Sequence, residues 1–232
     1  VYRAHDPQLK RDVAIKVLPS HLARDTESRE RFLREARMAA SLSHPNIVPI
    51  HRVGEAGGFV FFVMSYVEGE TLGERLRTRG PLPPTEATRV MREVIEPTVR
   101  GMAADGAPFT GFLYAGLMID ASGAPKVIEF NVRFGDPETQ PVMLRLQSDL
   151  VALVEAAVDG KLDATQARWD ARPALGVVMA AENYPGTPRL GDVIGAWDAP
   201  DVDDTKVFHA GTRVEGDHVV TYGGRVLCVC AL

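Results

Sequence analysis

Four short apolar runs, separated by polar turns, shape the first part of the chain. Each run is rich in β-branched or aromatic side chains and predicts a strand: Val1–Ala4, Val13–Leu18, Ile47–Ile50 and Phe59–Met64. The last run follows a Gly57-Gly58 turn. From about Thr26, apolar residues recur at helical spacing between charges, and Asp25 or Thr26 can cap that helix. The pattern predicts a small α+β lobe.

A proline-rich break, Pro81–Pro84, precedes the next helical pattern. Thr85 can cap this helix, whose apolar positions then fall on one face: Val90, Met91, Val94, Ile95 and Val99. Pro97 lies within it and should kink or restart it, because proline has no N–H to donate.

Strands and one long helix are expected in the remainder. Phe109–Ile119 and Pro125–Val132 flank a polar turn and predict two strands. Pro141–Val158 has an apolar face at helical spacing and predicts one helix, which Gly160 ends. From Arg172 onward, strand and turn patterns alternate, which predicts a mostly β subdomain.

The composition is that of an ordinary globular protein, but the charge is uneven. The chain has 232 residues, 45% hydrophobic and 25% charged, and its net charge is −5. Residues 1–94 carry a net charge of +3 and residues 95–232 carry −8, which suggests two unrelated pieces. Basic residues alternate with acidic ones, so we expect no nucleic-acid surface. No apolar run approaches the roughly 20 residues of a membrane helix, and a cytoplasmic protein is expected. Cys228 and Cys230 are interpreted as two buried apolar residues rather than a metal pair.

An ordered set of four motifs characterises the first ninety residues: Val13-Ala14-Ile15-Lys16, Phe32-Leu33-Arg34-Glu35-Ala36, His44-Pro45-Asn46-Ile47-Val48 and Met64-Ser65-Tyr66-Val67-Glu68-Gly69. Together they resemble the N-terminal lobe of bacterial Ser/Thr protein kinases, a small antiparallel sheet with one helix. The resemblance implies that Lys16 holds nucleotide phosphates, that Glu35 pairs with Lys16, and that Met64, Tyr66 and Val67 border the nucleotide. After residue 94 the chain has no H-R-D, D-F-G or A-P-E motif, so we expect no phosphoryl transfer.

Three polar side chains alternate with apolar ones near residue 130. Period two places Glu129, Asn131 and Arg133 on one strand face. Glu129 and Asn131 offer hard oxygen ligands suited to Mg²⁺, and Arg133 can hold a phosphate. From these residues alone, an exposed polar strand face explains the pattern equally well.

A longer string resolves that choice through resemblance. Gly111–Met118 followed by Glu129–Gln140 resembles phosphoribosylamine–glycine ligase, an ATP-grasp enzyme of purine synthesis, and the similarity extends over about residues 89–232. The family implies Mg²⁺ or Mn²⁺ on Glu129 and Asn131, ATP as substrate, and contact of Arg133 with phosphate or substrate. Roles for Asp136 and Glu138 stay open between structural and catalytic. His209 is interpreted as a structural histidine at a strand end, with catalysis as the alternative.

The expected organisation is therefore an α+β chain in four parts. An incomplete kinase-like lobe, residues 1–88, is followed by a junction helix at 89–94, the end of an ATP-grasp domain at 95–160 and a truncated ligase C-terminal subdomain at 161–232. The string Arg89–Val94 fits both families. We call residues 1–88 the N-terminal segment and residues 95–232 the C-terminal segment, and we expect little packing between them.

The expected function is that of the ligase family, ATP-dependent joining of glycine to phosphoribosylamine, with no activity in this form. The alternatives are a kinase-like nucleotide-binding fragment and a misjoined product without a function of its own. Small molecules (ATP, glycine and phosphoribosylamine) are the implied partners. No membrane, nucleic-acid or protein partner is implied.

Overall fold

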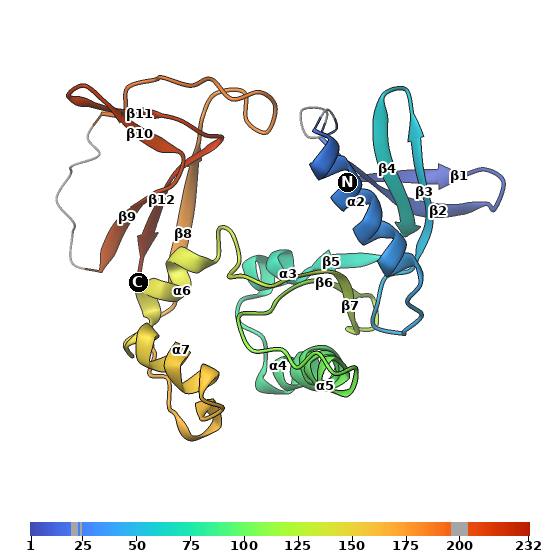
Figure 1. Cartoon of the computed structure of the whole chain (residues 1–232), viewed down its shortest axis with the longest axis horizontal. Helices are drawn as coiled ribbons and strands as arrows, with labels where there is room; N and C mark the ends of the chain where they lie inside the picture. The colour runs from blue at the N-terminus through green and yellow to red at the C-terminus, as the bar shows by residue number, and fades with distance from the viewer. Residues whose placement is uncertain (20–22, 24, 196–203) are drawn as a thin grey trace. The chain divides into compact units, whose positions relative to one another are not determined.

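The computed structural model describes residues 1–19, 23, 25–195 and 204–232. These residues form two compact units, drawn together in Figure 1. Unit 1 comprises Val1–Phe109 and Ala115–Phe130, and unit 2 comprises Thr110–Tyr114 and Asn131–Leu232. Among the described residues, no helix combines the length and the apolar character needed to cross a membrane.

Unit 1 begins with a four-stranded antiparallel sheet and one helix (Figure 1). The strands are β1 (Tyr2–Asp6), β2 (Arg11–Val17), β3 (Ile50–Ala56) and β4 (Phe59–Ser65), in the order β1-β2-β4-β3. Helix α2 (Thr26–Ala40) starts where the Asp25 carboxylate accepts the Ser28 N–H. Its Ala36 packs into a buried cluster with Ala14, Phe62 and Met64. The predicted α+β lobe is confirmed.

The strand predicted at Ile47–Ile50 is wrong in position, because β3 begins only at Ile50. Pro49 has no N–H for a sheet hydrogen bond. The residues ahead of it pair elsewhere: the Val48 N–H donates to the Val127 carbonyl at 2.9 Å, and the Val127 N–H donates to the Asn46 carbonyl at 2.6 Å. This stretch therefore belongs to a contact with the C-terminal segment.

The junction lies within a helix that changes its winding. After β5 (Gly69–Thr71) and α3 (Leu72–Arg79), the chain forms α4 (Pro84–Val90), a π-helical turn over Met91–Ile95, and α5 (Glu96–Ala104). Pro97 lies in the first turn of α5, where its missing N–H is tolerated. The Thr98 hydroxyl donates to the Val94 carbonyl at 2.7 Å and so satisfies one carbonyl in the wide turn. The predicted restart of the helix at Pro97 is wrong: the backbone stays helical from Pro84 to Ala104, and only its winding changes just before Pro97.

A hairpin of the C-terminal segment completes unit 1. Strands β6 (Tyr114–Asp120) and β7 (Pro125–Asn131) form a three-stranded sheet with β5, in the order β5-β6-β7. A side chain at Gly69 would approach the Ile119 carbonyl oxygen to 2.0 Å, so the backbones of β5 and β6 can come this close only at glycine.

The two segments share apolar clusters, contrary to the expectation of little packing. Val94, Leu117 and Val127 are buried together and pack against Ile47 and Leu72 of the N-terminal segment. Ile128 packs against the cluster that contains Phe62. The expectation fails because the hairpin offers both an apolar face and free backbone groups to the Asn46–Val48 loop.

Two short helices follow in unit 2, where one was predicted. Helix α6 (Thr139–Arg145) ends before Leu146, which is extended and forms a β-bridge with Trp169. Helix α7 (Leu150–Val158) begins where the Asp149 carboxylate accepts the Val151 N–H at 2.8 Å. The predicted stop at Gly160 is confirmed by its positive φ of 67°.

The rest of unit 2 is a small β structure. Strands β8 (Leu175–Ala180), β9 (Thr205–His209) and β12 (Arg225–Ala231) form an antiparallel sheet in the order β8-β12-β9, and β10 (Thr212–Glu215) pairs with β11 (His218–Thr221). Cys228 and Cys230 lie buried on β12 with their sulfurs 3.5 Å apart, opposite Gly176, which leaves room for both. Burial raises the pKa of the Cys230 thiol to about 12, as in a buried apolar position.

Candidate functional site

Lys16 lies on β2, in the middle of the N-terminal sheet. Its Nζ donates to Glu129 Oε2 at 2.8 Å, across 113 residues of sequence. The two side chains are about one third and one half exposed, at 33% and 46%. Gly116, on the neighbouring strand, makes room for Glu129, because a side chain there would meet the Glu129 Cγ at 3.1 Å. The structure thus places a predicted phosphate-binding lysine against a predicted metal ligand.

The pair between Lys16 and Glu35 expected from the kinase resemblance is not formed. Glu35 is exposed on α2, and among the described residues the carboxylate that pairs with Lys16 is Glu129. Ala36, its neighbour on the same helix, takes the inward position instead. The role predicted for Lys16 in holding nucleotide phosphates stays a prediction.

The other three residues predicted to border a nucleotide have different surroundings. Met64 is buried in the core, and Val67 packs against that cluster. Tyr66 is exposed, and the Arg3 guanidinium lies 4.6 Å from its ring centre. Met64 and Val67 therefore stabilise the lobe, whereas Tyr66 remains available at its surface.

Asn131 and Arg133 lie at the end of β7 and beyond it. Asn131 is the last residue of the strand, and Arg133 falls in the following bend, so the prediction that the strand continues to Val132 is wrong. Arg133 Nη2 donates to Asn131 Oδ1 at 3.3 Å and Nη1 donates to the Phe134 carbonyl at 2.8 Å. Arg133 is held by its own loop.

The fit of a divalent cation can be judged from these contacts. One carboxylate oxygen of Glu129 accepts a hydrogen bond from an ammonium group, and the amide oxygen of Asn131 accepts one from a guanidinium. The described residues also contain no group of three or more His, Cys, Asp or Glu side chains placed to hold a metal ion. Each predicted ligand thus already has a cationic hydrogen-bond partner, and the roles of Glu129 and Asn131 as Mg²⁺ ligands stay predictions.

Asp136 and Glu138 have structural contacts within unit 2. The Asp136 carboxylate and carbonyl both accept from Arg225 Nη1, at 2.8 and 3.0 Å, and Arg225 Nε donates to the Tyr184 hydroxyl at 3.0 Å. Tyr114 donates to the Glu138 carboxylate at 3.3 Å. Sequence reasoning missed Arg225, because nothing in its local pattern, after Gly223-Gly224, points to a partner 89 residues away.

His209 is the last residue of β9, and its Nδ1 lies 3.1 Å from the Thr212 hydroxyl oxygen. This contact joins the strand to the turn that follows. It agrees with the structural interpretation of His209, which stays a prediction.

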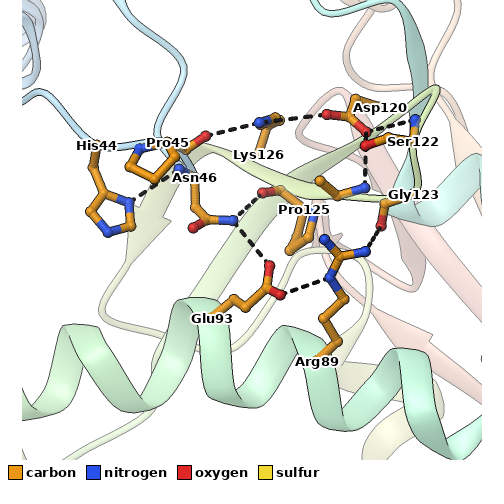
Figure 2. Close-up of polar contacts among 11 residues, drawn as sticks. His44, Pro45, Asn46, Arg89, Glu93, Asp120, Ser122, Gly123, Pro125 and Lys126 are labelled. Atoms are coloured by element: carbon orange, nitrogen blue, oxygen red, sulfur yellow. Dashed lines mark hydrogen bonds and ion pairs between the residues drawn. The ribbon is translucent and has the colours of Figure 1, made fainter.

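A polar network joins the two segments within unit 1 (Figure 2). The Asn46 amide donates to the Pro125 carbonyl at 3.0 Å and to Glu93 at 3.3 Å. Lys126 donates to the Pro45 carbonyl at 2.9 Å. Arg89, from α4, donates to Glu93 at 2.8 Å and to the Gly123 carbonyl at 3.2 Å. Apart from the Arg89–Glu93 pair, which lies within one helical stretch, these hydrogen bonds link distant parts of the sequence, and sequence patterns alone gave no sign of them.

Comparison with protein families divides the chain in two. Residues 1–102 match the protein kinase domain model. Residues 78–139 match the phosphoribosylglycinamide synthetase ATP-grasp (A) domain, and residues 174–232 match the C domain of the same synthetase. The kinase and ATP-grasp matches overlap over residues 78–102, which contain the string that fits both patterns. The chain thus combines a kinase-like N-terminal part with a ligase-like remainder.

Curated relatives support the same division. The chain is 71% identical over 150 residues to phosphoribosylamine–glycine ligase of Xanthomonas campestris pv. campestris, a match covering 64% of this chain and 35% of that protein. The ligase of Vibrio cholerae is 65% identical over 144 residues, covering 62% and 34%. The chain therefore spans about a third of the length of these relatives, at 35% and 34%. Among solved structures, one described as PpkA-294 apo form has a TM-score of 0.46 and 20% identity, covering 55% of this chain and 52% of that one.

Proposed function

We propose that the C-terminal segment carries the function of phosphoribosylamine–glycine ligase. In that reaction ATP phosphorylates the glycine carboxylate, and the amine of phosphoribosylamine then displaces phosphate to form the new C–N bond of glycinamide ribonucleotide. The proposal rests on 71% identity over 150 residues with a ligase of this name. ATP, glycine and phosphoribosylamine are the substrates proposed, with a divalent metal as the family's cofactor and the cytoplasm as the compartment.

In this proposal the given chain does not itself catalyse the ligase reaction. The observation that carries this point is the ion pair between Lys16 and Glu129 at 2.8 Å. A predicted metal ligand of the C-terminal segment is engaged by a lysine of the N-terminal segment, and Asn131 is engaged by Arg133. Residues 1–77, moreover, match the kinase domain model and lie outside both synthetase matches. The stretch directly before the ligase-like part therefore follows the kinase pattern.

Coupled ADP release tests the inactive state. The full chain is incubated with ATP, glycine and phosphoribosylamine, and release is compared with a reaction lacking glycine. We expect no difference between the two. Glycine-dependent release at the rate of an intact ligase would contradict the inactive state, and it would leave the assignment to the ligase family standing.

Metal binding tests the observation on which the inactive state rests. Lys16→Met removes the ammonium group that competes with a cation for the Glu129 carboxylate, so we expect Mn²⁺ to bind about two- to fivefold more tightly, the range for a partly exposed ion pair. Lys10→Met, in the turn between β1 and β2, is the matched control and should leave Mn²⁺ binding unchanged. Equal Mn²⁺ affinity of the wild-type chain and Lys16→Met would refute the blocking role of Lys16.

A second candidate function is nucleotide binding by the N-terminal segment. The position of the Lys16 ammonium favours it, since this group is partly exposed and its partner carboxylate can be exchanged for a phosphate. We expect saturable ATP binding that Lys16→Met abolishes, measured by isothermal titration calorimetry, and no transfer of labelled phosphate to a generic protein substrate. ATP binding that survives Lys16→Met would exclude this site.

A further inference from the structure

A polar cavity of about 490 Å³ lies in unit 1 where the two segments meet. Helix α3 contributes Arg75 and Arg79, helix α4 contributes Glu86 and Arg89, and the turn between β6 and β7 contributes Ser122. Its volume is within the range of small-molecule sites in proteins, roughly 300–1,000 Å³. Residues of both segments line this cavity.

Arg75 is the least satisfied cation of this cavity. Its side chain is only 12% exposed, and its polar partner among the described residues is Glu86, at the long distance of 3.4 Å. Its second terminal nitrogen, Nη1, is buried and has no hydrogen-bond partner among those residues. A buried charged donor without a partner is costly, so such a group needs an acceptor that these protein residues do not provide.

The other charged groups of the cavity have closer partners. Arg79 pairs with Glu70 at 2.8 Å. Arg89 pairs with Glu93 at 2.8 Å and donates to the Gly123 carbonyl, as Figure 2 shows. The Asp120 carboxylate accepts from Ser122 and Ala124 and pairs with Lys126. Glu86 differs: within the described part of the chain its partner is Arg75, at 3.4 Å, and its side chain is 49% exposed. An incoming anion therefore competes with one carboxylate, Glu86, for one guanidinium.

We propose that this cavity binds the phosphate group of a small phosphorylated molecule, with Arg75 as its principal ligand. A small shift of the guanidinium toward the cavity gives Nη1 and Nη2 two phosphate oxygens, the paired geometry that arginine favours. Arg79 and Arg89 also line the cavity, and each is paired with a carboxylate, Glu70 and Glu93. The volume beyond the phosphate accommodates the rest of the ligand.

Titration of the full chain with inorganic phosphate and with pyrophosphate tests the site, against chloride at matched ionic strength. We expect saturable binding that Arg75→Gln weakens about tenfold or more, as for loss of a charge-assisted hydrogen-bond pair. Arg77→Gln, an exposed arginine on the same helix outside the cavity, is the matched control and should bind like the wild-type chain. Glu86→Gln removes the competing carboxylate and should bind phosphate about threefold more tightly.

Four results would overturn the proposal. One is the absence of saturable phosphate binding by the wild-type chain. Another is equal loss of affinity in Arg75→Gln and Arg77→Gln, which would indicate a non-specific charge effect. The third is weaker phosphate binding by Glu86→Gln. Because this substitution keeps the shape of the side chain, its result can be interpreted even if the Arg75 variant fails to fold. Acetate binding as tight as phosphate would reject the phosphate assignment.

Discussion

The two compact units differ in how they bury their apolar side chains. In unit 1, residues from both segments share clusters: Val94, Leu117 and Val127 pack against Ile47 and Leu72. In unit 2, whose residues follow the ligase pattern, one face of β8 remains open, with Leu175, Val177 and Met179 all more than half exposed at 68%, 55% and 52%. The apolar side chains at which the two segments meet in unit 1 are therefore better buried than those on the exposed face of β8 in unit 2.

The difference teaches what a joined segment needs in order to pack. The hairpin of β6 and β7 brought an apolar face, backbone groups that pair with Asn46 and Val48, and Lys126 for the Pro45 carbonyl. Together these contacts bury apolar side chains and give the buried polar groups hydrogen-bond partners. The exposed face of β8 has apolar side chains alone, and a large exposed apolar patch marks a surface suited to a partner.

The largest expected effect is a charge placed in the shared core. Val127 is 5% exposed, and Val127→Asp should destabilise unit 1 by about 3–5 kcal/mol, as for a buried unpaired charge. Val158→Asp, at an exposed position of unit 2, is the control and should change stability by no more than about 0.5 kcal/mol. Hydrogen exchange reports on unit 1, and tryptophan fluorescence on unit 2, because both tryptophans lie in residues 131–232. If both variants lost a similar amount of unfolding free energy, the core shared by the two segments would be no more sensitive than an exposed position of unit 2.

A smaller effect is expected from the polar network between the segments. Asn46→Ala removes the hydrogen bonds to Pro125 and Glu93 and should cost unit 1 about 1–2 kcal/mol in urea unfolding. Asn46→Asp keeps the size of the side chain but loses the N–H donors and places a carboxylate beside Glu93. It should therefore destabilise unit 1 more than Asn46→Ala does. If Asn46→Asp is as stable as the wild type, the network does not hold the segments together.

Acid should weaken unit 1 through Asp120. Hydrogen bonds from the Ser122 hydroxyl and the Ala124 N–H, with Lys126 nearby, hold its pKa at about 2, below the unfolded value of about 3.9. The stabilisation is therefore complete above about pH 4 and is lost as the pH falls toward 2. Asp120→Asn should flatten this part of the pH dependence of hydrogen exchange in unit 1. The tryptophan signal of unit 2 should keep its own acid dependence, because a hydrogen bond from Arg172 lowers the pKa of Asp170 there.

The smallest effect is expected on the open face of unit 2. Val177→Thr should change the unfolding free energy by no more than about 0.5 kcal/mol, since the side chain is already exposed. Val226→Thr, at a buried position of the same sheet, should cost about 1–3 kcal/mol, because its hydroxyl enters an apolar cluster. Thermal unfolding followed by tryptophan fluorescence compares the two. A large loss for Val177→Thr would mean that this face is covered in solution.

Local patterns predicted most elements of the fold. The cap at Asp25, the turn at Gly57-Gly58 and the stop at Gly160 each depend on one or two neighbouring residues, and each is where the sequence places it. The break between α6 and α7 was missed although Asp149 carried a capping signal, because the apolar face of Pro141–Val158 continues through it at helical spacing.

The candidate site was less accessible to sequence reasoning. Patterns and resemblance singled out Lys16 and Glu129 separately, in two different settings. Their contact bridges 113 residues and depends on the hairpin of one segment docking against the sheet of the other. No local periodicity contains that information. Resemblance to each family also pointed to other partners, Glu35 for Lys16 and a metal ion for Glu129.

The π-helical turn at Met91–Ile95 changes what can be expected of a junction inside a helix. One residue more or less turns the rest of an α-helix by about 100°, and would rotate an apolar face out of its cluster. Here Val90, on one side of the turn, and Ile95, at its end, pack against the same cluster around Val94. A wider turn can absorb a mismatch of phase between two joined sequences. The positions at which two coding sequences can be joined within a helix are then less restricted than strict α-helical register would require.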